Sequence, residues 1–73
     1  MEKRFEIIVS ESERGKRLED MLFDRFGALS RMYIRDVVKA ENCDVNGRFE
    51  NVGYRLRERD FVEIYLDLTR ETA

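Results

Sequence analysis

Residues 30–47 read SRMYIRDVVKAENCDVNG and contain the signals for one helix and one tight turn. Ser30 has the side chain of a helix N-cap, because its hydroxyl can accept a hydrogen bond from a backbone N–H of the first turn. Apolar residues then recur at helical spacing, which predicts a helix over residues 31–40. Its buried stripe comprises Ile34, Val37 and Val38. After a short β-prone segment at 43–45, Asn46-Gly47 predicts a two-residue hairpin turn, since both residues tolerate positive φ.

Three cations of the same helix lie four residues apart: Arg31, Arg35 and Lys39. Residues at this spacing form one row along a helix, and this row flanks the apolar stripe without joining it. We therefore expect three positive side chains on an accessible edge of the helix, where they can meet phosphate groups. The alternative interpretation is an ordinary solvated helix face, with Asp36 beside the cations.

The flanking segments predict an α+β fold in which two short helices pack on a small antiparallel sheet. A β-prone run covers residues 5–9, and helical spacing predicts a first helix from about Gly15 to Phe26. Further β-prone segments lie at 48–50, 54–57 and 61–66, with a polar turn at 58–60. Residues 67–73 carry no packing signal and are expected to fray. The whole chain, residues 1–73, is read as one domain.

The predicted core takes the apolar positions of these elements: Ile7, Val9, Leu18, Leu22, Phe26, Ile34, Val37, Val38, Val45, Leu56, Val62 and Ile64. Cys43 is expected to be a small buried hydrophobic residue. Tyr33 and Tyr54 are expected to pack on the core; the alternative for both is stacking on exposed bases. Three alternating arginines are assigned to the solvated surface: Arg55, Arg57 and Arg59.

The composition favours a binding module over an enzyme. The chain has 73 residues, no histidine and one cysteine. This inventory excludes Ser-His-Asp triads, Cys-His pairs and the usual zinc sites, so we predict no catalytic residue, metal or cofactor. No apolar run approaches the roughly 20 residues of a membrane span. The acidic, interrupted N-terminal segment is unlike a signal peptide, and a cytoplasmic location is therefore expected.

The net charge of −2 conceals an uneven distribution of charge. Residues 14–39 contain seven basic and four acidic side chains, which gives this segment a charge of +3. Residues 1–13 contain two basic and four acidic side chains, and residues 40–73 contain five basic and eight acidic ones. The middle of the chain is thus a basic segment between acidic ends, which is compatible with a polyanionic partner.

Several short motifs occur in a familiar order. They are Gly15-Lys16-Arg17-Leu18-Glu19, Leu29-Ser30-Arg31 with Ile34, Val45-Asn46-Gly47, Tyr54-Arg55-Leu56, and Asp60. Together they resemble the RNA-binding domain of ribosomal protein S-four, also called the α-L motif, over about residues 15–65. The β-prone run and the acidic stretch before Gly15 are most similar to the N-terminal module of ribosomal-RNA pseudouridine synthases. The HRLD motif of their catalytic domain cannot be present, because the chain has no histidine.

The resemblance implies non-catalytic binding of structured RNA, ribosomal or transfer RNA, by a basic surface of the helix pair and adjoining hairpin. Carried over by position, the implied RNA-binding residues are Lys16, Arg17, Ser30, Arg31, Arg35, Lys39 and Arg48. It also implies a possible fused or associated RNA-modifying catalytic domain, and a monomer is expected. Ion pairs of Lys16 and Arg17 with Asp20 or Glu13 are an equal alternative for those two residues. The alternative function is a protein-interaction module that keeps the fold without RNA binding, which the acidic surplus favours.

The chain departs from the family pattern at two turns. The glycine that family members commonly carry after the second helix is missing, so Asn42 is expected to supply the left-handed residue. The last turn reads Glu58-Arg59-Asp60 in place of Gly-Asp. Glu41 and Asp44 are expected to place negative charge near the RNA-facing surface.

Overall fold

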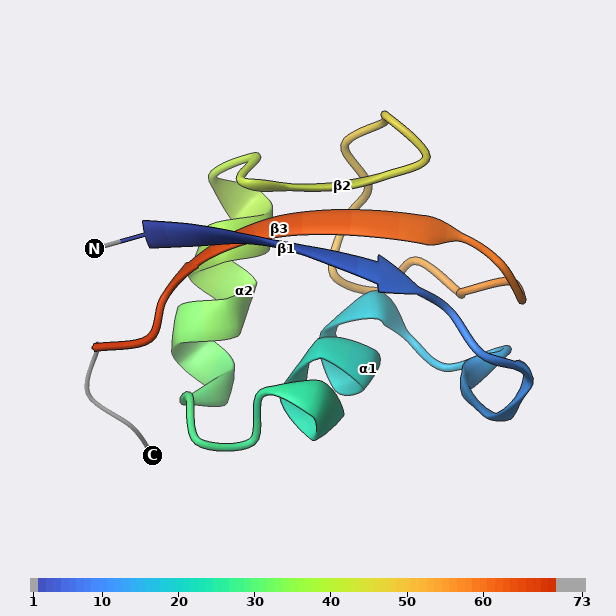
Figure 1. The fold of residues 1–73 in the computed structure, drawn as a ribbon, viewed down its shortest axis with the longest axis horizontal. Coiled ribbons are helices and arrows are strands. Elements are labelled where there is room, and N and C mark those ends of the chain that lie inside the picture. The colour runs from blue at the N-terminus through green and yellow to red at the C-terminus, as the bar shows by residue number, and fades with distance from the viewer. Residues whose placement is uncertain (1, 70–73) are drawn as a thin grey trace.

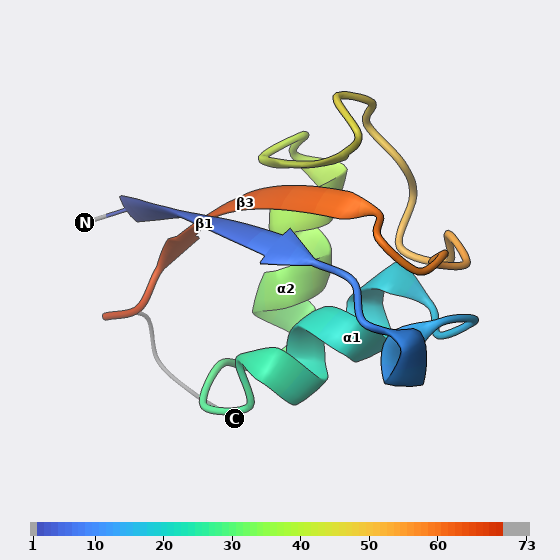
Figure 2. The ribbon, with the colours of Figure 1, turned by 45° about the vertical axis from the view of Figure 1, so that its right-hand side comes forward.

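The computed structural model describes residues 2–69 and has the predicted fold class, with two helices packed on a three-stranded antiparallel sheet. The elements are β1 (Glu2–Ile8), a 3-10 turn η1 (Glu11–Glu13), α1 (Leu18–Arg25), α2 (Arg31–Lys39), β2 (Cys43–Val45) and β3 (Phe61–Asp67). The strand order is β1-β3-β2, so the last strand lies in the middle of the sheet. Both helices cover the same face of that sheet (Figures 1 and 2).

The core lies between this face and the helices. Val62, Ile64 and Leu66 alternate along β3 and are buried, as predicted for the first two. Every predicted core residue is buried except Phe26, which is half-buried with its ring 5.1 Å from that of Phe5. The core also includes Cys43, as expected, and three apolar residues that were not predicted to be buried: Met21, Leu29 and Leu66. Each buried side chain of this size contributes about 1.5–3 kcal/mol.

Three aromatic and sulfur-containing residues have the predicted environments. Burial raises the pKa of the Cys43 thiol to about 12, so this side chain is an inert hydrophobic residue. Tyr33 and Tyr54 are half-buried and pack against the core. The Tyr33 hydroxyl accepts a hydrogen bond from the backbone N–H of Asp67, so the position of this tyrosine is fixed by the end of β3.

The first helix is shorter than predicted at its N-terminal end. Gly15 has a φ of +86°, a left-handed conformation that favours glycine. Its N–H donates to the carbonyl of Leu56, and Arg17 forms an isolated antiparallel bridge with Arg55. Residues 15–17 are therefore held against a distant segment in a non-helical conformation, and the helix begins only at Leu18.

The predicted hairpin turn forms, but its return strand does not. Asn46 and Gly47 both have positive φ, 54° and 81°, and Arg48 donates back to the carbonyl of Val45. Beyond this bridge the chain leaves the sheet, so the strand predicted at 48–50 was wrong. The cause lies in Asn46, whose backbone N–H and side-chain oxygen both bond to the backbone of Phe61. These bonds attach the turn to β3, which pairs with β2 directly.

Several other boundaries also differ from prediction. The first strand covers 2–8 where 5–9 was predicted, and α2 ends one residue before Ala40. The predicted strand at 54–57 is not part of the sheet, and its strand-like pairing is limited to the isolated Arg17–Arg55 bridge. The left-handed residue after α2 is Glu41, with a φ of 63°, and not Asn42. Asp67 belongs to β3, so fraying was wrongly predicted there, and residues 70–73 of that predicted tail lie outside the described residues.

Candidate nucleic-acid interface

Glu19, in the first turn of α1, is a fully buried carboxylate with a side-chain exposure of 0%. One carboxylate oxygen accepts hydrogen bonds from Arg35 Nε at 2.7 Å and from Arg31 Nη1 at 3.3 Å. The other accepts from Arg17 Nη2 at 2.5 Å. Three guanidinium groups thus converge on one acid, and we call Arg17, Arg31 and Arg35 the arginine cluster. A buried charge requires such partners, because an isolated one is strongly destabilising.

Arg31 is also held by two side chains of α1. Its Nη1 donates to Asp20 Oδ1 at 2.8 Å, and its guanidinium carbon lies 4.6 Å from the centre of the Phe23 ring, a cation–π contact. Arg17 Nε lies 3.9 Å from the second oxygen of Asp20 and has no hydrogen bond within residues 2–69. The cluster is therefore organised by both helices together.

The predicted row of unpaired cations on α2 is wrong for two of its three members. Arg31 and Arg35 form ion pairs with α1 carboxylates, and only Lys39 makes no ion pair or side-chain hydrogen bond with the described part of the chain. The arginine side chains are nevertheless 41–47% exposed. The row therefore exists as predicted from helical spacing, but a neighbouring helix supplies counter-charges that spacing within one helix cannot reveal.

The hydrogen bonds keep every group in the cluster charged. The bond from Arg35, followed by that from Arg17, lowers the pKa of Glu19 to about 2. The hydrogen bond to Glu19 raises the pKa of Arg17, and the bond to Asp20 raises that of Arg31. Arginine is protonated throughout the accessible range, so the cluster is fully ionised at neutral pH.

The other predicted site residues lie outside the cluster. Lys16 forms an ion pair with Asp24 at 2.8 Å, so the alternative partners Asp20 and Glu13 were wrong for it. Ser30 is the predicted N-cap of α2, and its hydroxyl accepts from the N–H of Tyr33 at 3.1 Å. Arg48 is exposed directly after the hairpin turn.

Arg48 and Arg57 line a shallow polar hollow on the loop side of the molecule. Arg57 is exposed, like the neighbouring Arg55 and Arg59, as predicted for all three. Arg55 also donates from Nη1 to the carbonyl of Gly15 at 3.0 Å. Arg48 thus belongs to a separate group of cations on the loops that follow β2.

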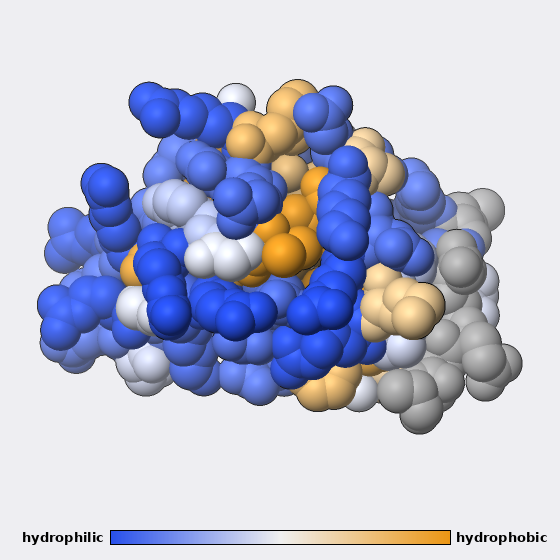
Figure 3. Space-filling model, turned by 180° about the vertical axis from the view of Figure 1, so that it is seen from behind, coloured by the Kyte–Doolittle hydropathy of each residue, from blue (hydrophilic) through white to orange (hydrophobic). Residues whose placement is uncertain are grey.

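A second hollow, of about 300 Å³, adjoins the arginine cluster. It lies between the end of α2 and the segment 49–52, and its lining is Val38, Lys39, Glu41, Phe49, Glu50, Asn51 and Val52. Figure 3 shows a strongly hydrophobic depression surrounded by hydrophilic residues on this face. Two links join it to the cluster: Arg35 lies one turn before Lys39 on α2, and the N–H of Glu19 donates to the carbonyl of Val52.

The two acids expected near the RNA-facing surface are on different faces. Glu41 lines this hollow, as expected. Asp44 lies opposite Glu63 in the sheet and between two buried residues of β2, so its side chain points to the face away from the helices. The expectation was therefore wrong for Asp44, because strand alternation directs it to the other side of the sheet.

Residues 2–69 contain neither a membrane-spanning helix nor a group of metal ligands. No helix in that range is both long and apolar enough to cross a lipid bilayer. No three cysteine or acidic side chains in it are grouped as metal ligands would be. Comparison of the chain with models of known protein families and with curated proteins gives no match.

Proposed function

We propose that this protein binds structured RNA without catalysis, through the arginine cluster and Lys39. The resemblance to the domain of ribosomal protein S-four supports a ribosomal or transfer RNA in the cytoplasm as the target. The chain would act alone or as the targeting module of an RNA pseudouridine synthase. The observation that carries the proposal is that one buried carboxylate positions three guanidinium groups from two parts of the chain, each more than 40% exposed.

The ion pairs with α1 leave most of the donors of the cluster available. A guanidinium group has five N–H donors in a planar fork, and Arg35 uses only its Nε on Glu19. Its two Nη groups can bind a phosphate bidentately. Because Glu19 already holds the side chain in place, less conformational entropy is lost when RNA binds. The ion pairs therefore preorganise the cluster as a phosphate site and reduce its net charge.

The remaining positive charge of this surface is modest. Arg17, Arg31, Arg35 and Lys39 contribute four positive charges, and Glu19 and Asp20 remove two, which leaves +2 in a chain whose net charge is −2. Binding to about two to four phosphates predicts a log–log dependence of affinity on salt with a slope of about −2 to −4. Contacts to the backbone and shape of an A-form stem are expected to dominate over sequence readout.

The test uses Lys39, because its replacement leaves Glu19 and its three partners in place. RNA stem-loop binding is titrated at low and moderate salt for the wild type, Lys39→Glu and the matched control Arg59→Glu. Arg59 is exposed in the turn before β3, and its side chain has no partner within residues 2–69. Both variants lower the net charge by the same amount. Lys39→Glu is expected to weaken binding roughly tenfold and flatten the salt slope by about 1, whereas Arg59→Glu changes little.

The outer face of the sheet favours a second candidate, a protein-interaction module. Ile8 and Tyr65 are exposed there beside Glu6 and Glu63, on the side of the sheet that the helices leave uncovered. Wild-type protein that does not bind RNA, or that responds equally to Lys39→Glu and Arg59→Glu, would contradict the RNA proposal and favour this candidate.

A further inference from the structure

We propose that the hollow between α2 and the segment 49–52 receives one unpaired nucleobase of the bound RNA. This inference rests on the proposed RNA binding and adds to it a site for a base beside the site for the backbone. The hollow has a volume of about 300 Å³. None of the residues that line it is a buried charged residue. Its occupant is therefore recognised by an apolar wall and by the groups on its rim.

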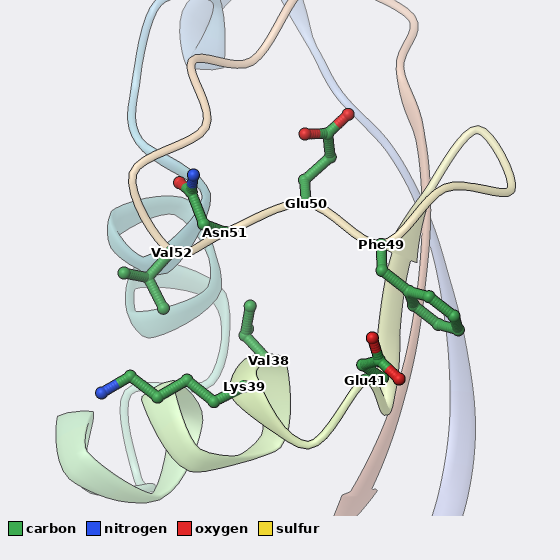
Figure 4. A pocket seen from close by; sticks show the side chains of 7 residues that line it. All are labelled: Val38, Lys39, Glu41, Phe49, Glu50, Asn51 and Val52. Atoms are coloured by element: carbon green, nitrogen blue, oxygen red, sulfur yellow. The ribbon is translucent and has the colours of Figure 1, made fainter.

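The walls of the hollow suit a flat aromatic ligand. Val38 and Val52 lie near each other on one side of the hollow, and Phe49 lies on the other side, where its ring extends away from the valines and toward Glu41 (Figure 4). Phe49 is 60% exposed, although phenylalanine is usually buried. Single-stranded RNA is recognised by bases that stack on exposed aromatic rings. Phe49 therefore offers an exposed stacking surface at the edge of the hollow, and the two valines give the hollow an apolar floor.

The cations Lys39 and Arg35 beside the hollow suit the phosphate of a nucleotide, and the lining also carries the acids Glu41 and Glu50. Lys39 lies on its rim and has no partner within the described residues, and Arg35 of the cluster is one helical turn away. A nucleotide joins an apolar ring to a phosphate, so it can satisfy the hollow and the adjacent cations at the same time. An apolar side chain of a protein would leave Lys39 without a counter-charge.

Glu41 supplies a preference among bases. Its side chain makes no hydrogen bond or ion pair with residues 2–69, and it stands beside Phe49 on the rim, whereas the Glu50 carboxylate points away from Val38 (Figure 4). An ionised carboxylate only accepts hydrogen bonds. It therefore favours a base edge with adjacent donors, such as N1–H and the exocyclic amino group of guanine, over uracil, which offers one N–H.

The experiment compares three RNA duplexes of one sequence, without a bulge, with a single bulged guanine and with a single bulged uracil. For the wild type, the bulged guanine is expected to increase affinity roughly tenfold over the unbulged duplex, with a smaller gain for uracil. Phe49→Ala is expected to abolish both gains and leave binding to the unbulged duplex unchanged. Tyr65→Ala, which removes another exposed aromatic ring on the outer sheet face, is the control and should retain them. Glu41→Gln should reduce the preference for guanine over uracil.

The outcomes separate this inference from the proposed function. If the unbulged duplex binds with the expected salt dependence but Phe49→Ala leaves the effect of the bulge unchanged, the nucleobase site is overturned and RNA binding stands. The same holds if a bulge gives no gain at all, and the hollow would then fit an apolar side chain of a protein partner. If no duplex binds the wild type, both proposals fail. Circular dichroism melting shows that each variant is folded, as expected for exposed positions.

Discussion

Two buried carboxylates, Glu19 and Asp60, organise different segments of the molecule with different partners. Glu19 is surrounded by the arginine cluster. Asp60 accepts hydrogen bonds from neutral groups only: the Asn46 side chain at 3.0 Å, and the Tyr54 hydroxyl and Arg57 N–H at 2.9 Å each. Burial raises the pKa of Asp60, but these three bonds and the positive charge of Arg57 together lower it by more, so the pKa lies below its usual value. Both acids are thus ionised, but only one has cationic partners.

The difference in partners separates a structural role from a binding role. The donors to Asp60 come from the hairpin turn and from two loop positions. This acid, directly before β3, therefore holds irregular segments of the chain together. The groups that donate to it are all neutral. The partners of Glu19 are exposed cations with unused donors, and they can serve a ligand while they stabilise the acid. A buried acid with neutral donors indicates a fold determinant, and one with exposed arginines indicates a candidate interface.

Removal of the Asp60 carboxylate is expected to have the largest effect on stability. Asp60→Ala leaves three donors without their acceptor, each bond to a charged group being worth about 1.5–3 kcal/mol, so the free energy of unfolding should fall by about 4 kcal/mol. Urea denaturation measures this loss. Glu58→Ala removes an exposed acid from the same turn and is expected to change stability by less than about 0.5 kcal/mol. Equal stability of the two variants would show that Asp60 does not hold the loops together.

Acid titration tests the ionisation of Glu19. Its pKa is lowered from 4.5 to about 2 in the folded protein, so its contribution to stability is complete above pH 4.5 and is lost as the pH falls toward 2. This contribution amounts to at most about 3 kcal/mol. Glu13, whose pKa the hydrogen bond from Arg25 lowers to about 2, adds to the same loss in the wild type. Glu19→Gln should therefore show a flatter decline over this pH range, measured by urea denaturation at each pH. Glu58→Gln should follow the wild-type curve, and a Glu19→Gln curve that does the same would refute the assignment.

The smallest expected effects are those of salt concentration on stability, which should distinguish Glu19 from Asp60. Arg35→Ala removes one donor to Glu19, and Tyr54→Phe removes one donor to Asp60. Each change should lower the free energy of unfolding by about 1 kcal/mol at low salt. At about 1 M salt the Debye length is roughly 3 Å, so the cost of Arg35→Ala should shrink because the Arg35 side chain is 47% exposed. The cost of Tyr54→Phe should stay constant because its donor is neutral. Thermal melting at two salt concentrations measures both, and equal salt dependence would remove the distinction between the two acids.

Local signals predicted the elements whose residues interact within a few positions of one another. Helix α2 could be predicted because its Ser30 cap and its apolar stripe lie within a few residues of one another in the sequence. The structure confirms both. The positive φ of Asn46 and Gly47 followed from their residue types. The start of α1 could not be predicted, because the segment 15–17 is held out of the helix by residues about 40 positions away, as in the hydrogen bond from Arg55 to Gly15.

The candidate site was predicted in part for the same reason. The motif that includes Lys16, Arg17 and Glu19 pointed to the correct part of α1, and the i, i+4 spacing placed Arg31 and Arg35 in one row. Neither signal indicated that Glu19 is buried between them, since its bonds to Arg31 and Arg35 span 12 and 16 positions. The hollow beside the cluster was also missed, because its two walls come from segments about ten residues apart that meet only in the folded chain.

The amino-acid sequence by itself determined helix α2 and the turn at Asn46-Gly47, because capping, apolar periodicity and the conformational freedom of glycine and asparagine act over a few neighbouring residues. Tertiary packing alone decided which charges meet. The two helices bring Glu19 against three arginines, and the loop after β2 returns beside α2 to form the hollow. Whether a cation is paired depends on distances of a few ångströms between segments far apart in the chain, which no local pattern encodes.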